Sequence, residues 1–132
     1  MSNTNEVLDA LLDSWARNNT ILLNLLRVLP AAGLEARVAA DSPSVAEMFA
    51  HIHYVRMVFV SEDAPEFSAE IPQHEWTNEH DPNRIAQLLS ESAKAVQDAV
   101  KGRLARARKQ LQENLRLFLK RQDVYTDESE SS

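Results

Sequence analysis

The sequence contains no cysteine, two glycines and five prolines, and no apolar run of the roughly 18 residues that a membrane-spanning helix needs. Without thiols, the chain can form neither disulfide bonds, nor thiolate metal sites, nor a cysteine nucleophile. Few glycines and prolines argue against a sheet, which needs frequent turns. The first residues also lack the basic and apolar regions of a signal peptide, so we expect a cytoplasmic protein without a membrane partner. At 132 residues, with many leucines and alanines, the sequence predicts one all-α domain.

The formal net charge is −6, and it is unevenly distributed. Residues 1–100 carry 6 basic and 15 acidic side chains, whereas residues 101–121 carry 8 basic side chains and 1 acidic one. The basic side chains that could contact nucleic-acid phosphates are Arg103, Arg106, Arg108, Lys109, Arg116, Lys120 and Arg121. The acidic remainder argues against a nucleic-acid partner, so the alternative of a solvated helix face is favoured.

The first predicted helix covers residues 5–29 and is followed by a short link over residues 31–41. Its apolar positions step by three and four residues, as in the seam of an antiparallel bundle. The seam consists of Leu8, Leu12, Trp15, Asn19, Leu22, Leu26 and Leu29, with Asn19 as its one polar member. A polar residue in a seam either forms a hydrogen bond within the core or lines a polar pocket. Both alternatives are open for Asn19, and Trp15 is either a core residue or part of the same pocket.

The second predicted helix covers residues 42–60. Ser44 and Glu47 have the spacing of a capping box, in which each side chain accepts a hydrogen bond from the other residue's backbone N–H group. Steps of three and four predict a buried face that consists of Val45, Met48, Ile52, Val55 and Phe59. His51 lies on the flank of this face, whereas His53 points about 120° away from its centre.

Residues 61–81 contain two prolines and show no helical period, so they are predicted to be a loop. The loop holds His74, Trp76 and His80. After it, a last helix is predicted from about residue 82 to residue 121. It should continue through Gly102, because the apolar step stays at about 3.7 residues and no capping residue follows the glycine. The stripe consists of Ile85, Leu89, Ser92, Val96, Val100, Leu104, Ala107, Leu111, Leu115 and Phe118, of which only Ser92 is polar.

The predicted last helix is too long for its neighbours. About 40 residues at 1.5 Å each span roughly 60 Å, about twice what the first two helices could cover. We therefore expect a homodimer in which the 104–118 apolar stripe is exchanged and supplies a fourth helix to the other chain. The alternative is a turn at Gly102 and a monomeric four-helix bundle. The bundle domain is predicted over residues 1–121, with a disordered acidic tail over residues 122–132.

Three segments resemble a known family. The segments LLDSWARNNTILLNLLRVLP and SPSVAEMFAHIHYVRMVFV resemble the first two helices of the DinB/YfiT-like superfamily. The segment DPNRIAQLLSESAKAVQDAV resembles its third helix. The resemblance covers about residues 5–100. It implies a DinB-like up-and-down helical bundle, often dimeric, that binds a divalent metal ion through one histidine of the second helix and an HxxxH pair of the last helix. Several members are transferases or isomerases that depend on small thiols.

By its place in the motif, His51 corresponds to the family's first metal ligand. No histidine follows Lys101, so the HxxxH pair has no counterpart in this sequence. A complete site would need His74 or His80, a carboxylate, or a second subunit. The implied cofactor is a divalent ion such as Zn²⁺ or Ni²⁺, and the incomplete ligand set predicts that none is bound stably.

Two functions follow from the resemblance. One is a DinB-type metalloenzyme with His51 as metal ligand, His80 as a further candidate ligand, and Trp15 and Asn19 in the pocket. The other is a metal-free helical dimer that acts as a scaffold or interaction protein.

Overall fold

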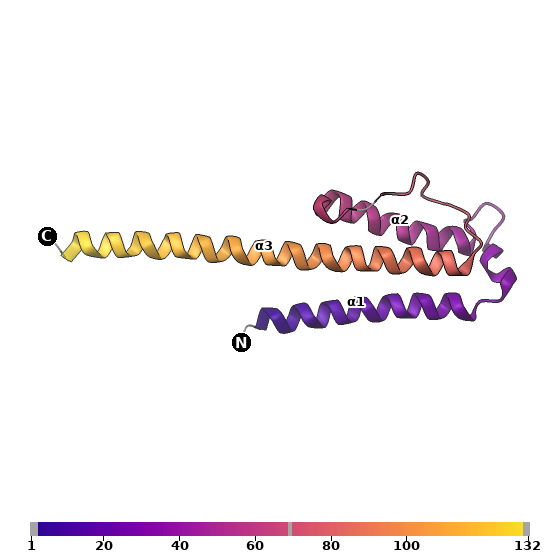
Figure 1. Ribbon diagram of the computed structural model, residues 1–132, viewed down its shortest axis with the longest axis horizontal. Coiled ribbons are helices and arrows are strands. Elements are labelled where there is room, and N and C mark those ends of the chain that lie inside the picture. The colour runs from indigo at the N-terminus through magenta and orange to yellow at the C-terminus, as the bar shows by residue number, and fades with distance from the viewer. Residues whose placement is uncertain (1–2, 69, 131–132) are drawn as a thin grey trace. The chain divides into compact units, whose positions relative to one another are not determined.

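The computed structural model describes residues 3–68 and 70–130, and the side chains of residues 6–68 and 70–124. The described residues form three α-helices and two short 3₁₀ helices, and they contain no β-strand (Figure 1). In chain order these elements are α1 (Asn3–Val28), η1 (Ala31–Glu35), α2 (Val45–Asp63), η2 (Pro65–Phe67) and α3 (Pro82–Glu130). The all-α class is therefore confirmed. The chain divides into a first unit that ends at Ala99 and a second unit that begins at Val100.

The start of α2 is the capping box that the sequence predicts. The Ser44 hydroxyl accepts a hydrogen bond from the Glu47 backbone N–H group, and the Glu47 carboxylate accepts one from the Ser44 N–H group, both at 3.1 Å. Arg37 lies 2.9 Å from the same carboxylate. The pKa of Glu47 is lowered chiefly by the Ser44 backbone N–H group, then by the Ser44 side chain, with a smaller contribution from Arg37.

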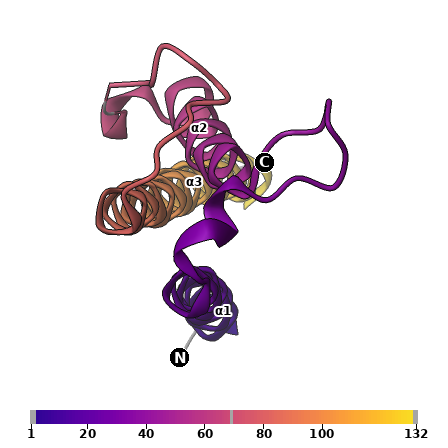
Figure 2. The same cartoon turned by 90° about the vertical axis from the view of Figure 1, so that its right-hand side faces the viewer.

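The core of the first unit is formed by residues of all three helices. Figure 2 shows the ribbons of these helices from one end. Its main cluster consists of Leu26, Leu34, Ala46, Phe49, Ile85 and Leu89. A second cluster, near the end of α2, consists of Val60, Ala64 and Ala99. Leu22 and Leu29 pack against the main cluster and Asn19 is buried, so the predicted seam of α1 is the face that the structure uses.

The prediction of which face of α2 is buried is wrong for three of its five residues. Met48, Val55 and Phe59 are 51%, 49% and 39% exposed. The buried positions of α2 are Ala46, Phe49, His53, Arg56, Met57 and Val60, and they also lie three or four residues apart on the helix. Because α2 is apolar on more than one side, the period alone does not select a face. His53, which was predicted to point away from the core, is 6% exposed.

The prediction of one helix through Gly102 is confirmed, since α3 continues to Glu130. The helix therefore includes residues 122–130, which the sequence assigns to a disordered tail, while residues 131–132 lie outside the described residues. The boundary between domain and tail stays a prediction. In the part of the chain that the structure describes, no helix combines the length and the apolar composition of a membrane span.

Candidate functional site

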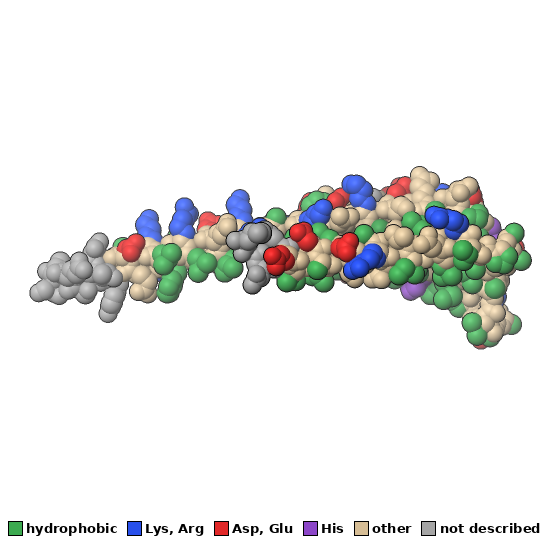
Figure 3. All heavy atoms as spheres, turned by 90° about the horizontal axis from the view of Figure 1, so that it is seen from below, with side chains coloured by type: hydrophobic (Ala, Val, Ile, Leu, Met, Phe, Trp, Pro, Cys, Tyr) green, Lys and Arg blue, Asp and Glu red, His purple; other side chains and the backbone are tan. Residues whose placement is uncertain are grey.

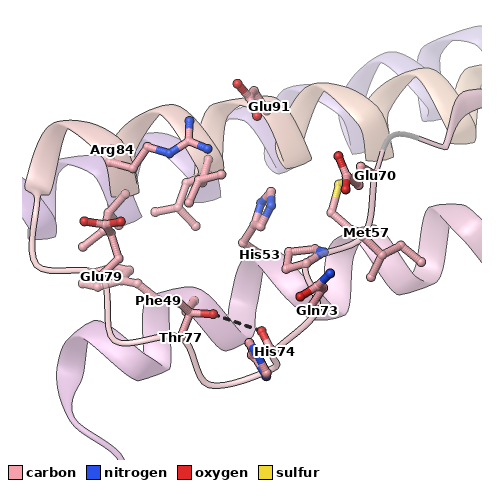
Figure 4. Close-up of a pocket in the computed structure, with 16 residues that line it drawn as sticks. Phe49, His53, Met57, Glu70, Gln73, His74, Thr77, Glu79, Arg84 and Glu91 are labelled. Carbon is pink, nitrogen blue, oxygen red and sulfur yellow. Dashed lines mark hydrogen bonds between the residues drawn. The ribbon is translucent and has the colours of Figure 1, made fainter.

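A cavity of about 480 Å³ lies in the first unit, where α2, the loop over residues 70–79 and the first turns of α3 meet (Figure 4). Its volume is within the range of small-molecule sites, roughly 300–1,000 Å³. Buried apolar side chains of α2 and α3 form part of the wall: Phe49, Met57, Ile85 and Leu89. The titratable side chains in the wall are His53, Glu70, His74, Glu79, Arg84 and Glu91. The cavity therefore combines an apolar wall with several charged groups.

His53 is the buried polar residue of this cavity. Figure 4 shows its side chain extending from α2 into the space between Glu70 and Glu91. Its Nδ1 atom has no hydrogen-bond partner among the residues that the structure describes. The pKa of His53 is lowered, mainly by burial, with smaller downward contributions from Arg56 and Arg84, while the Leu88 carbonyl and the Glu91 carboxylate act in the opposite direction. A neutral imidazole offers one donor and one acceptor, so the ring can accept a hydrogen bond from a bound molecule.

We expect the His53 imidazole to titrate below its ordinary pKa of 6.5 in the folded protein. Because its pKa is lower in the folded chain than in the unfolded chain, the unfolded chain binds more protons as the pH falls through about 6.5. The contribution of this residue to stability is thus present above that pH and is lost as the pH falls toward the folded pKa. NMR titration measures the pKa directly. An imidazole that titrates above 6.5 in the folded protein would contradict the expectation.

His51 lies outside this cavity, next to the loop. Its Nδ1 atom is 2.9 Å from a carboxylate oxygen of Glu75, an ion-pair distance when the ring is protonated. Its ring stacks on Trp76, with centroids 4.1 Å apart and planes at 11°. The loop thus supplies His51 with one carboxylate and one aromatic surface.

The other predicted metal ligand, His80, has a different neighbour. Its Nδ1 atom lies 4.0 Å from a carboxylate oxygen of Glu35. In the ranges 6–68 and 70–124, whose side chains the structure describes, no three His, Cys, Asp or Glu side chains form a group that could hold a metal ion. The donors beside His51 therefore do not fit the three-histidine site that the resemblance implies. A metal role for His51 or His80 stays a prediction.

Trp15 and Asn19 are brought together around a buried arginine, Arg56, which is 7% exposed. Its guanidinium lies 4.7 Å from the centroid of the Trp15 ring, within the range of a cation–π contact. Its Nη1 atom donates to three oxygens: Oδ1 of Asn19 at 3.0 Å, the carbonyl of Leu89 at 3.0 Å and the hydroxyl of Ser92 at 3.3 Å. Burial lowers the pKa of Arg56.

Asn19 therefore forms a hydrogen bond within the core, the first of its two alternatives. The indole N–H group of Trp15 donates to the carbonyl of Ala93 at 2.9 Å. The wall of the 480 Å³ cavity is made by other residues. A ligand-binding role for Trp15 and Asn19 stays a prediction.

Sequence reasoning missed His53, Arg56 and the three carboxylates of the cavity. The sequence did contain a signal for His53, because this residue belongs to a second stripe of regularly spaced positions on α2 that begins at Ala46. A histidine within an apolar stripe is typical of a buried polar site. No signal identified Glu70 and Glu79, because a loop has no period that could place them.

Comparison with known proteins supports the resemblance noted in the sequence. The model of the DinB family matches residues 1–131, which extends beyond the segment of about residues 5–100 that carries the resemblance. No curated protein and no solved structure matches the chain.

Proposed function

The chain belongs to the DinB family, and on that premise we propose that it is a homodimeric helical protein that acts as a scaffold or interaction protein. The dimer forms through the apolar stripe of the second unit, which packs against the first unit of another copy. The observation that carries this proposal is the exposure of that stripe.

The α3 seam, as we call this stripe, consists of Leu104, Ala107, Leu111, Leu115 and Phe118. Leu111, Leu115 and Phe118 are 59%, 52% and 55% exposed. Figure 3 shows hydrophobic side chains along one edge of this part of α3 and lysines and arginines along the opposite edge. Contiguous exposed apolar surface of this kind marks an interaction site.

The distribution of charge favours a second copy of the chain as the partner of the second unit. Residues 101–121 carry 8 basic side chains and 1 acidic one, whereas residues 1–100 carry 15 acidic and 6 basic ones. Because opposite charges attract, the basic second unit of one copy should meet the acidic first unit of another copy more readily than two like units meet each other.

The first unit also offers apolar surface to such a partner. Three helices leave the place of a fourth helix in a bundle uncovered. The large apolar side chains that α1 and α2 expose are Val7, Leu11, Ile21, Leu25, Val28, Met48, Val55 and Phe59. Packing of the α3 seam on this surface would complete a four-helix arrangement in each half of the dimer.

The proposal predicts that Leu111→Asp dissociates the dimer. An aspartate at the centre of the seam would place an unpaired carboxylate in a buried apolar contact. Light scattering coupled to size-exclusion chromatography should give twice 14.9 kDa for the wild type, and a mass that falls toward 14.9 kDa for the variant at the same concentration.

The matched control is Lys109→Gln. It changes the net charge by the same amount, and its side chain lies about 160° around the helix from Leu111. We expect this variant to remain dimeric. A wild-type mass of 14.9 kDa at all concentrations would contradict the proposal, and so would equal dissociation of both variants.

A metal-dependent activity at His51 is the second candidate, and the contact between His51 and Glu75 favours it. These two side chains would supply one nitrogen and one oxygen ligand. No third side-chain ligand lies beside them in the part of the chain that the structure describes, so in this candidate a second copy supplies one, and the candidate also depends on the dimer.

A further inference from the structure

We propose that the cavity beside His53 binds a small organic molecule that carries a protonated amine on an apolar body. This site is independent of the dimer, because all of its residues belong to the first unit. Three features support it: the apolar wall, the excess of carboxylates and the buried imidazole of His53, whose Nδ1 atom has no partner in the described part of the chain.

The apolar wall suits a hydrophobic body. Phe49, Met57 and Ile85 are 4%, 2% and 3% exposed, so they are fixed parts of the core that also face the cavity. Their contact with an apolar ligand would remove its surface from water without ordering any mobile side chain. An aromatic or aliphatic body therefore fits this side of the cavity.

The charged groups favour a cation over an anion. Glu70, Glu79 and Glu91 contribute three carboxylates to the wall, and Arg84 contributes one guanidinium. One nitrogen of that guanidinium already donates to the amide oxygen of Gln87 at 3.1 Å. A carboxylate or phosphate ligand would meet the three carboxylates, whereas an ammonium group would be attracted to them.

The imidazole of His53 supports the same choice. The residue is more than nine-tenths buried, its side chain extends into the cavity wall, and its Nδ1 atom has no partner in the described part of the chain. A buried polar atom without a partner needs a donor or acceptor from elsewhere. An ammonium group has three donors and no acceptor, which suits a site whose carboxylates and imidazole can accept.

Calorimetric titration of the full chain with 2-phenylethylamine tests the proposal. Two probes with the same body serve as references: 3-phenylpropionate, which carries a carboxylate, and 2-phenylethanol, which is neutral. We expect the amine to bind at least roughly tenfold more tightly than either reference. Equal or tighter binding of 3-phenylpropionate would overturn the choice of a cation, and no heat with the amine up to about 10 mM would overturn the site.

The variant Glu91→Gln tests whether the amine binds in the cavity beside His53. This substitution keeps the shape of an exposed side chain on α3 and removes one carboxylate from the wall. We expect it to weaken amine binding roughly tenfold, while Glu113→Gln in the second unit leaves binding unchanged. Equal affinities of the wild type and Glu91→Gln, or an equal loss in both variants, would show that the amine binds elsewhere.

Discussion

Replacement of Arg56 by alanine is expected to lower the free energy of unfolding by about 3 kcal/mol. The substitution leaves the oxygens of Asn19 and Ser92 buried without the guanidinium that they contact in the folded protein. It also removes the contact with the Trp15 ring and leaves a void between the helices. The release of a desolvated charge offsets part of this cost, which is why the expected loss is smaller than the sum of the lost contacts.

Urea unfolding followed by circular dichroism, at one protein concentration for all variants, measures this effect. Arg17→Ala is the control, because Arg17 pairs with Asp13 on the surface and should change stability by at most about 0.5 kcal/mol. An Arg56→Ala loss below about 1 kcal/mol would show that the buried network does not stabilise the fold.

Asn19→Ala tests whether the network acts as a unit. If it does, the double variant with Arg56→Ala should lose less stability than the sum of the two single losses, with a coupling of at least about 0.5 kcal/mol. Strict additivity would mean that the hydrogen bond between Arg56 and Asn19 contributes nothing of its own.

Local signals predicted the helix starts and the course of α3. The capping box of Ser44 and Glu47 acts through neighbouring backbone groups, so its spacing in the sequence is sufficient to place the start of α2. The helix through Gly102 was also predictable, because a lone glycine costs only about 1 kcal/mol relative to alanine and no stop signal accompanies it. Both predictions depend only on residues within a few positions of each other.

The buried face of α2 depended on partners far away in the sequence. Arginine is rarely buried, because its charge must leave water. Arg56 is nevertheless buried, because α1 and α3 supply hydrogen-bond acceptors for its guanidinium, 33 to 37 residues away along the chain. His53 is buried because α3 covers it, as the contributions of Leu88 and Glu91 to its pKa show. A rule that assigns apolar residues to the core therefore selected the wrong stripe.

The surroundings of His51 could be predicted only in part. The resemblance singled out this residue, and the structure gives it a specific environment, with Glu75 and Trp76 in contact. Both partners come from an irregular loop whose path no period in the sequence encodes. Sequence reasoning thus singled out His51 as a candidate but did not predict the side chains that surround it.

Leu89→Ala is the second substitution with a large expected effect, about 2–5 kcal/mol of lost stability. Leu89 is completely buried in the main core cluster, and its backbone carbonyl accepts a hydrogen bond from Arg56. Because the substitution keeps that carbonyl, its cost reports the packing of the side chain alone. Urea unfolding measures it against Leu117→Ala, which removes the same atoms from an exposed position and should cost less than about 1 kcal/mol.

The same leucine also lines the cavity beside His53. Its truncation should therefore enlarge the cavity on its apolar side without changing the carboxylates that select a cation. If Leu89→Ala remains folded, the preference for 2-phenylethylamine over 3-phenylpropionate should persist while the affinity for both changes. A reversal of that preference would show that the shape of the wall, and not its charge, selects the ligand.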